Sequence, residues 1–540
     1  MARSNRFAKT SNLDESLPEL CRRLWKGRVP ATLERDGRIC HLICSRDNLA
    51  AVCQWLGSDL GFVFATLIVE ESTTGERSLL YAFYKDASSP WTYVELQLEA
   101  GSEAVPSISG VTHGPSADWH EREAEDLFGL TFEGHPRLGE FVLHEDWPEG
   151  VNPMRPSFNA HQRPELRAPD PRWEPPTIVT APGAFAMPVG PVFSDFAESA
   201  HFLLETVGED VIRTIPRFFY KYRGVEKIAE GERADRVLLL AERFSGTSAF
   251  AHGLAFCQAI ETICGIEVPL RARAFRTVFG ELERLRHHAA VITGICNSTA
   301  LAVATSQAAV IEENLLRLTC ELTRHRYLFG AVKPGGLACD VPSEACDDVA
   351  VAIGNSAEKL HELHEMLRYS SSFLDRLEEV GIVRTENAKA YGLVGPIARA
   401  SGVDRDIRKL FPYAAYGLVD FAVPVELEGD GYARLRVLFR EAEQSASIIR
   451  QILFAPPEGP ISVAEISWRE GAALSAVEAP HGAAFHWVRL RGDGAVARYR
   501  VTPPSFANWH GFHLAAENFA FQDFPIILAS FGLSNAECDR

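Results

Sequence analysis

The sequence WHEREAEDLFGLTFEGHP, residues 119–136, is the most informative stretch of this chain. Four acidic residues and one arginine crowd into the run EREAED, residues 121–126, and tryptophan, phenylalanine and glycine surround it. Taken alone, EREAED is most simply explained as the solvated charged face of a helix. The alternative is that the run belongs to a longer sequence signature that includes the aromatic residues and glycines around it.

The residues around this stretch predict a small α/β domain. Residues 38–45, 62–69, 78–84 and 92–98 are rich in apolar and β-branched residues, which favours strands. Residues 46–60 predict a helix that Asp47 and Asn48 can cap, and residues 116–128 form a charged amphipathic segment. We expect the first domain to span residues 1–155.

A proline-rich segment follows this domain. Ten of the 31 prolines lie between Pro153 and Pro191. Proline lacks an amide donor and disfavours helix, so we expect residues 156–190 to form an extended linker. The segment is also too long for an ordinary loop, which places the domain boundary within it.

Residues 191–540 predict a mainly α-helical domain with a minor β-sheet. Apolar residues recur at steps of three and four in residues 235–264, 276–293, 302–328 and 344–379, which indicates helices packed as a bundle. Residues 482–501 predict β-structure, with Asp493 and Gly494 as a hairpin turn. The predicted fold class is therefore α+β, with an α/β domain, a linker and a helical bundle domain.

Composition excludes several classes of function. The 540 residues carry a net charge of −18, which repels a phosphate backbone and argues against nucleic acid as a partner. No apolar run reaches the roughly 18–20 residues of a membrane helix, and the first residues lack a secretory apolar region, so we expect a soluble, cytoplasmic chain. None of the 11 cysteines forms a C-x-x-C pair, which weighs against zinc, iron–sulfur or nickel ligation by this chain.

The opening stretch resembles the signature of the small peripheral-arm subunit of complex I, W-x-E-R-E-x-x-D-x-F-G-x-x-F-x-G-H-P. The matching residues are Trp119, Glu121, Arg122, Glu123, Asp126, Phe128, Gly129, Phe132, Gly134, His135 and Pro136. A match this dense favours the longer sequence signature over a solvated helix face as the explanation of EREAED.

The second part of the chain, from about Met187 to Arg540, resembles the quinone-site subunit of complex I and the large subunit of nickel–iron hydrogenases. The motifs that carry this resemblance are YRGVEK (222–227), GELERLRHH (280–288), GLVGPIARASGVDRDIRK (392–409), GDGYAR (429–434), EAPHG (478–482) and PPSFAN (503–508). Both parts also occur fused in formate-hydrogenlyase-type large subunits of energy-converting hydrogenases.

The resemblance implies that the nickel site has been lost. Four cysteine thiolates hold a nickel–iron centre, because soft sulfur ligands suit that metal. The matching positions here are Ser245, Ser248, Ser534 and Glu537, and Cys538 is one residue out of register. The ending AECDR is similar instead to the ending of the quinone-site subunit. We therefore expect no nickel–iron centre and no metal bound by this chain.

The quinone site implied by the resemblance is altered as well. The motif that supplies a histidine near the quinone headgroup reads GPVFSDFAE here, with Phe193 and Ala197 at the two histidine positions. The headgroup tyrosine falls near Ser245 and Gly246, where no tyrosine exists. Phenylalanine cannot polarise a carbonyl or supply a proton, so reduction of ubiquinone by the usual residues is in doubt.

His481 stands where both related families carry arginine. Histidine titrates near neutrality and arginine does not, which predicts a pH-sensitive group in the former cavity. The alternative is a relaxed cavity in which His481 is a spectator. Together, Phe193, Ser245, Ser248, His481, Ser534 and Glu537 are predicted to line this vestigial cavity. His287 and His288 are not expected to pair on a metal, since adjacent helix residues point in different directions.

Three retained residues, Arg223, Arg284 and His288, are implied to lie near the terminal iron–sulfur cluster of a neighbouring subunit. Charged or titratable groups beside a cluster raise its potential and couple its reduction to proton uptake. The structural alternatives are a surface ion pair of Arg223 with Glu226 and a hydrogen-bonded core histidine at position 288.

The resemblance implies an electron-transport subunit related to NADH dehydrogenase, and two interpretations of its role stay open. In the first, the chain passes electrons from a [4Fe–4S] cluster in a small partner subunit towards quinone or another acceptor. In the second, it is a redox-silent scaffold that links that subunit to antiporter-like membrane subunits. Both place it peripherally on the cytoplasmic face of the inner or plasma membrane. No G-x-G-x-x-G motif lies at a strand-to-helix turn, so NAD would not bind here through a Rossmann site.

Overall fold

The structure is a computed structural model that describes residues 31–36, 39–110, 115–162, 164–168, 171–172, 179–180, 182–193 and 198–540. The chain divides into two compact units, Met1–Arg167 and Ala168–Arg540. The division falls inside the proline-rich segment. Helices and strands are both present in quantity, which confirms the mixed α+β class. Each unit is described by itself.

A five-stranded sheet forms the first unit, in the order β1-β2-β5-β4-β3. Its strands are β1 (Ala31–Asp36), β2 (Ile39–Cys44), β3 (Val63–Glu71), β4 (Arg77–Tyr84) and β5 (Trp91–Leu98). Strands β2 and β5 are parallel and the other neighbours are antiparallel. The helical connection after β2 has three parts, η1 (Arg46–Asn48), α2 (Leu49–Gln54) and η2 (Trp55–Asp59). Four strands were predicted; β1 was not, because ATLERD is mostly polar.

The charged stretch forms helix α3 (Asp118–Phe128), which follows η3 (Pro115–Ala117) and lies between β6 (Ala104–Pro106) and β7 (Thr131–Glu133). Glu121, Arg122 and Glu123 are buried rather than solvated, and Asp118, Glu125 and Asp126 are half-buried. Both oxygens of Glu121 accept hydrogen bonds, from Ser107, Ser109 and the Ile108 amide. The solvated-face explanation of EREAED is therefore wrong, and the carboxylates hold the loops on either side of the helix.

Asp126 is the clearest of these anchors. Its Oδ2 atom accepts hydrogen bonds from the backbone amides of Phe141, Val142 and Leu143, at 2.7–3.0 Å. The Asn152 side chain donates to the carbonyl of the same residue. One carboxylate thus satisfies three buried amides that have no strand partner.

We expect Asp126→Asn to lower the free energy of unfolding of the first unit by about 2–3 kcal/mol, because the neutral amide accepts weaker hydrogen bonds. Chemical denaturation followed by tryptophan fluorescence measures this. The matched control is Asp59→Asn at an exposed position, with an expected change within about 0.5 kcal/mol. Equal stability of the two variants would contradict the anchoring role.

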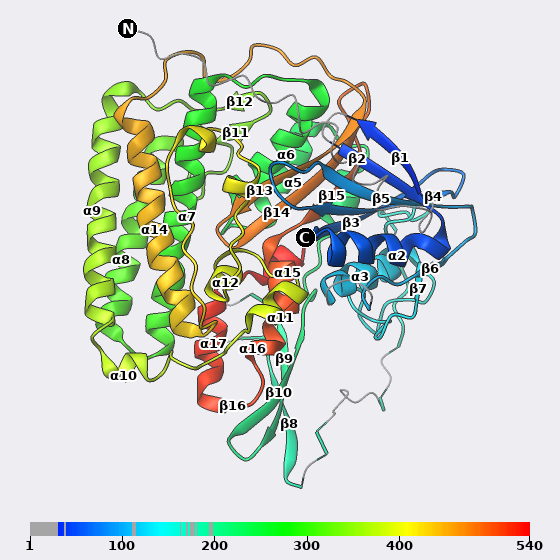
Figure 1. Cartoon of the computed structure of the whole chain (residues 1–540), viewed down its shortest axis with the longest axis horizontal. Helices are drawn as coiled ribbons and strands as arrows, with labels where there is room; N and C mark the ends of the chain where they lie inside the picture. The colour runs from blue at the N-terminus through cyan, green and yellow to red at the C-terminus, as the bar shows by residue number, and fades with distance from the viewer. Residues whose placement is uncertain are drawn as a thin grey trace. The chain divides into compact units, whose positions relative to one another are not determined.

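Long helices dominate the second unit. They are α5 (Ala234–Arg243), α6 (Ala249–Cys264), α7 (Leu270–Ser298), α8 (Ala302–Thr323), α9 (Ser343–Leu367) and α14 (Gly431–Phe454). Helices α7, α8, α9 and α14 run alongside one another (Figure 1) and bury a continuous apolar core. This confirms the predicted bundle. The run expected over residues 235–264 is two helices instead, because the serine- and glycine-rich segment at 245–248 interrupts it.

Shorter helices connect the bundle and end the chain. They are α4 (Val225–Ala229), α10 (Ser371–Leu374), α11 (Thr385–Ala390), α12 (Gly395–Ala400), α13 (Ile407–Leu410), η4 (Tyr416–Leu418), α15 (Pro504–His510), α16 (Phe512–Ala515), η5 (Phe521–Asp523), α17 (Phe524–Phe531) and α18 (Asn535–Cys538). Three of the six sequence motifs of the second part, YRGVEK, GLVGPIARASGVDRDIRK and PPSFAN, lie in these short elements and their connections.

Three small sheets complete the second unit. The strands are β8 (Ala184–Val189), β9 (His201–Val207), β10 (Asp210–Arg217) and β16 (Phe519–Ala520); β11 (Val332–Lys333) and β12 (Gly336–Leu337); and β13 (Gly471–Ala479), β14 (Gly482–Leu490) and β15 (Val496–Thr502). The predicted turn at Gly494 is present, with its amide bonded to the Arg491 carbonyl. Strand β8 lies within the predicted linker, and β9 and β10 replace expected helix, because their apolar residues pair across a hairpin.

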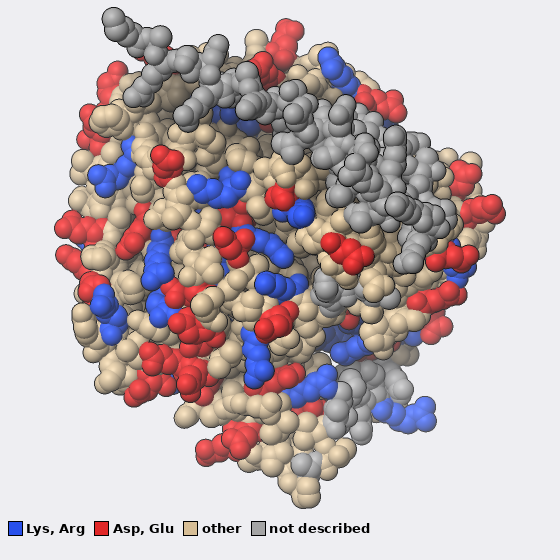
Figure 2. All heavy atoms as spheres, viewed as in Figure 1, with Lys and Arg blue, Asp and Glu red and all other residues tan. Residues whose placement is uncertain are grey.

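The surface of the second unit mixes the two signs of charge. On the face shown in Figure 2, basic and acidic side chains are intermingled, with a group of acidic residues at the lower left. In the described part of the chain, no helix is both long enough and apolar enough to span a bilayer.

Candidate functional site

Three sequence motifs meet at the turn between β13 and β14. Gly395 and Gly482 both have positive φ, and their backbones approach so closely that a Cβ on either would overlap the other segment. Asn508 joins them, since its amide donates to the carbonyl of His481 and its oxygen accepts from the amide of Val394. This packing fixes His481 at the tip of a rigid turn.

The C-terminal helix α18 supplies the second part of the site. Ser534 caps this helix by accepting from the amide of Glu537 at 3.3 Å. Glu537 is fully buried, and its Oε2 atom accepts from the amide of Ser505 at 3.2 Å. The cap and the amide together direct the Glu537 carboxylate inward.

The structure brings five of the six predicted cavity residues together. Ser245 donates to Oε1 of Glu537 at 3.2 Å, and Nδ1 of His481 lies 3.3 Å from the same oxygen. The hydroxyl of Ser248 lies 3.2 Å from Nδ1 of His481. Ser245 thus bonds directly to Glu537, and Ser248 is linked to Glu537 through His481.

Ser534 has a partner of its own. Its hydroxyl lies 3.1 Å from both oxygens of Glu198, and Glu198 also accepts from the amide of Ala536. Cys538 is buried in the same short helix. Within the described ranges, no group of three or more His, Cys, Asp or Glu side chains has an arrangement that could hold a metal ion.

Phe193 does not take part in these polar contacts. Its ring lies against Gly190, at the end of β8. Ala197, at the second histidine position, lies outside the described residues. An apolar ring offers no donor to a quinone carbonyl, so these residues do not fit the usual headgroup site.

Glu537 stays ionised although it is buried. Burial by itself raises its pKa, but the rings of His481 and His252 overcome this and hold the pKa well below its ordinary value. Nε2 of His252 lies 3.6 Å from the carboxylate. Burial is also the main reason that the pKa values of His287 and His486 are well below the ordinary value for histidine, so both rings are neutral at pH 7.

His481 is bonded on every side and is not a spectator in a relaxed cavity. Its Nε2 atom lies 2.8 Å from the carbonyl of Gly532 and 2.9 Å from Nε2 of His287. The two ring nitrogens of His481 thus face different partners. The predicted pH sensitivity of His481 stays a prediction.

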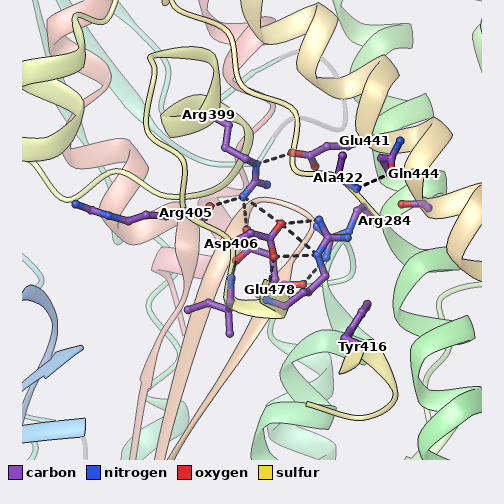
Figure 3. Close-up of polar contacts among 12 residues, drawn as sticks. Arg284, Arg399, Arg405, Asp406, Tyr416, Ala422, Glu441, Gln444 and Glu478 are labelled. Carbon is purple, nitrogen blue, oxygen red and sulfur yellow. Dashed lines mark hydrogen bonds and ion pairs between the residues drawn. The ribbon is translucent and has the colours of Figure 1, made fainter. Parts of the chain in front are cut away.

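His288 lies in a second buried cluster, an ion network built from the sequence motifs. Its Nε2 atom is 2.8 Å from Glu441, whose other oxygen accepts from Arg399 at 2.6 Å. Figure 3 shows Arg399 between Glu441 on one side and Asp406 and Glu478 on the other. His288 is therefore a hydrogen-bonded core histidine, which is the structural alternative given in the sequence analysis to a role near the iron–sulfur cluster.

Arg408 and Arg284 extend this network. Arg408 pairs with Asp406 at 2.6 Å and with Glu281 at 2.9 Å. Arg284 lies 3.3 Å from Glu281 and donates to the carbonyls of residues 478 and 479. All three arginines are almost completely buried, so the network is a structural element of the interior.

Among the described residues, Arg223 donates hydrogen bonds to backbone carbonyls and not to Glu226. It donates to the carbonyls of Phe244, Ala536 and Asp539, and so binds the segment before Ser245 to helix α18. Glu226 pairs instead with Arg498, Arg500 and Arg540. The proposed surface ion pair is therefore wrong, and Arg223 positions the C-terminal segment.

Comparison with known proteins identifies both parts of the chain. Residues 42–164 match the family of the respiratory-chain NADH dehydrogenase 30-kDa subunit. Residues 308–469 and 464–540 match the family of the 49-kDa subunit. The chain joins the 30-kDa and 49-kDa subunit families of complex I.

Full-length relatives are similar over most of this fused complex I chain. Formate hydrogenlyase subunit 5 of Escherichia coli is 29% identical over 475 residues, which is 87% of this chain and 83% of the relative. Hydrogenase-4 component G of the same organism is also 29% identical. The NADH-quinone oxidoreductase C/D subunit of Bdellovibrio bacteriovorus is 28% identical over 499 residues, or 86% of this chain and 88% of the relative. The predicted resemblance is confirmed.

The fused complex I chain also contains site residues that sequence reasoning missed. They are His252, Glu441 and His486, none of which is among the predicted site residues. Nδ1 of His252 lies 2.9 Å from His486, which is bonded in turn to Tyr499 at 2.8 Å. Histidines at alternate strand positions or inside a buried helix were the available signal, but it did not show which of them meet.

We expect Glu537→Gln to lower the free energy of unfolding of the second unit by about 3 kcal/mol, because it removes one charge from a buried, hydrogen-bonded pair. Thermal unfolding measures the change. The control is Glu198→Gln, which alters an exposed carboxylate bonded to the same helix and should cost about 1 kcal/mol or less. The loss in E537Q should shrink as the pH falls below about 4.5, where the unfolded carboxylate of the parent chain takes up a proton. A loss equal to that of the control would count against a buried ionised Glu537.

Proposed function

We propose that this chain is a subunit of a complex I-like, hydrogenase-related oxidoreductase that transfers electrons without a nickel–iron centre. Electrons would pass from a [4Fe–4S] cluster in a small partner subunit towards quinone or another acceptor. The subunit would sit peripherally on the cytoplasmic face of the membrane, bound to antiporter-like membrane subunits. The observation that carries the proposal concerns the positions that match the thiolate ligands of a nickel–iron centre. There Ser245, Ser248, Ser534 and Glu537 supply oxygen atoms, and the nitrogen atoms of His481 lie beside them.

The chemistry of these groups supports the exclusion of nickel. Hydroxyl and carboxylate oxygens are hard ligands, whereas the nickel–iron centre needs soft thiolates. Ser245, His481 and Glu537 already satisfy one another, so a metal would have to break these hydrogen bonds. The residues present therefore do not fit a nickel–iron centre.

A second candidate function is the redox-silent scaffold. The same hydrogen bonds favour it, because Ser245, His481 and Glu537 bond to one another and are not free to bind an acceptor. Phe193 adds to this, since it removes the donor that would orient a quinone headgroup. The fused complex I chain would then hold its partners together and transmit charge or conformational change.

Metal analysis of the purified complex tests the first part of the proposal. We expect nickel well below one atom per chain, with iron present in amounts that reflect the clusters of the partner subunits. Nickel at one atom per chain would overturn the proposal. A formate-hydrogenlyase-type complex carried through the same purification provides the positive control for nickel retention.

Quinone reduction with a low-potential donor separates the two candidate functions. An electron-transferring subunit predicts acceptor reduction that needs the intact complex, and Arg223→Gln should slow it by about 10-fold if that arginine also tunes the neighbouring cluster. Lys221→Gln alters an exposed residue on the same loop and is the control. Clusters that reduce fully while no acceptor turns over would favour the scaffold.

A further inference from the structure

A row of buried side chains connects the two clusters of the second unit. It runs from Ser245 and Glu537 through His481, His287 and His288 to Glu441. The contacts are 3.2 Å, 3.3 Å, 2.9 Å, 3.3 Å and 2.8 Å in that order. In each of the three histidine rings, one nitrogen contacts the preceding residue of the row and the other nitrogen contacts the following residue.

The row reaches the surface at one end. The hydroxyl of Ser245 lies 2.9 Å from that of Thr247. Thr247 is half-buried and follows the exposed Gly246, whereas Ser245 and Glu537 are buried. Two hydroxyl groups therefore lead from solvent to the Glu537 carboxylate, and a hydroxyl can accept one proton while it donates another.

The resting protons of the row follow from its partners. The Gly532 carbonyl beside Nε2 of His481 is an acceptor, which places a proton on that nitrogen, and the Ser248 hydroxyl can donate to Nδ1. Nε2 of His287 then accepts, which leaves the His287 proton on Nδ1. Nδ1 of His288 accepts that proton, and its own proton on Nε2 points to Glu441. Every donor in the row has an acceptor.

The inner end of the row is an ion network. Within the described part of the chain, this network contains the guanidinium groups of three arginines, Arg284, Arg399 and Arg408, and four carboxylates, Glu281, Asp406, Glu441 and Glu478. When all of these groups are ionised, the network has one negative charge in excess. Burial raises the pKa of Glu441, but Arg399 and His288 lower it well below its ordinary value, whereas burial and the neighbouring Asp406 raise the pKa of Glu478.

We propose that this row is a proton-transfer path from the Thr247 surface, through the interior of the second unit, to the ion network at Glu441. A proton enters at Ser245 and is passed to Glu537. Glu537 gives this proton to Nδ1 of His481, His481 gives its Nε2 proton to His287, His287 gives its Nδ1 proton to His288, and His288 gives its Nε2 proton to Glu441. Each step breaks one O–H or N–H bond and forms another, and no electron moves.

The remaining histidines of the site do not belong to the path. Nε2 of His252 is 3.6 Å from Glu537, which is too long for a hydrogen bond. Beyond it, His486 and Tyr499 form a branch of buried side chains that continues from His252. This branch helps to hold the charge on Glu537 but offers no exit. The path itself depends on this chain alone and would persist in a redox-silent scaffold.

Hydrogen exchange of the histidine rings tests the path. The full-length chain, with ¹⁵N in its histidine rings, is transferred to D₂O, and the loss of each ring N–H is followed by NMR. The N–H groups of His481, His287 and His288 should exchange at least 10-fold faster than the most protected backbone amides of α7. His287 should show the Nδ1–H tautomer. Single His→Gln variants assign the signals.

Substitutions then interrupt the path at known points. Ser245→Ala should slow exchange at all three rings by at least 10-fold, and Ser245→Thr should restore it because it keeps the hydroxyl. The matched control is Ser445→Ala, which removes another fully buried serine that donates to a glutamate, Glu281, outside the path. It should leave the three rates unchanged.

A second variant keeps the test decisive if the serine substitutions disturb the fold. His287→Phe should slow exchange at His288 while His481 stays fast, because the break lies between them. Equal rates in the parent chain and in S245A would overturn the path. So would an equal slowing by S445A, or ring exchange in the parent chain no faster than that of the protected amides of α7.

Discussion

The interior of the second unit depends on the pairing of buried arginines with buried carboxylates. Arg399 holds Glu441 of α14 and Glu478 of β13, and Arg408 holds Glu281 of α7. Taking such charges out of water costs several kcal/mol for each ion, and only close, multiple hydrogen bonds offset that cost. The sheet and the bundle helices must therefore keep one fixed spacing. The position of the turn that carries His481 is fixed in the same way, because this turn directly follows Glu478.

The sequence allowed much of the fold to be predicted where the pattern is local. Strands β2 to β5 and the bundle helices follow from apolar periodicity, and the turn at Gly494 follows from its residue type. Strand β1 was missed because ATLERD alternates too little, and β9 and β10 were missed because their apolar runs are short and fit either element. The long helix expected over residues 235–264 failed at Gly246, where serine, glycine and threonine favour a loop.

The candidate site was predictable only in part. Motif positions identified Ser245, Ser248, Ser534 and Glu537, and the structure places them in one polar cluster. Their partners were not predictable, because His287 and His481 are far apart in sequence and meet only through tertiary packing. Charge alone misled at Arg223, whose neighbour Glu226 is already neutralised by three other arginines. The proposed function rests on a similar contrast. Oxygen groups that form hydrogen bonds with one another do not bind nickel as thiolates do.

The hydrogen bonds around helix α18 have an evolutionary consequence. Ser534 is bonded to Glu198, and Glu537 is bonded to Ser245 and lies beside His481. A cysteine introduced at any one of these positions would lose these bonds at once and gain no metal until three more had appeared. The acquisition of four thiolates here would therefore have to pass through a series of less stable intermediates, and each further partner that adapts to the oxygen groups would make such a change harder.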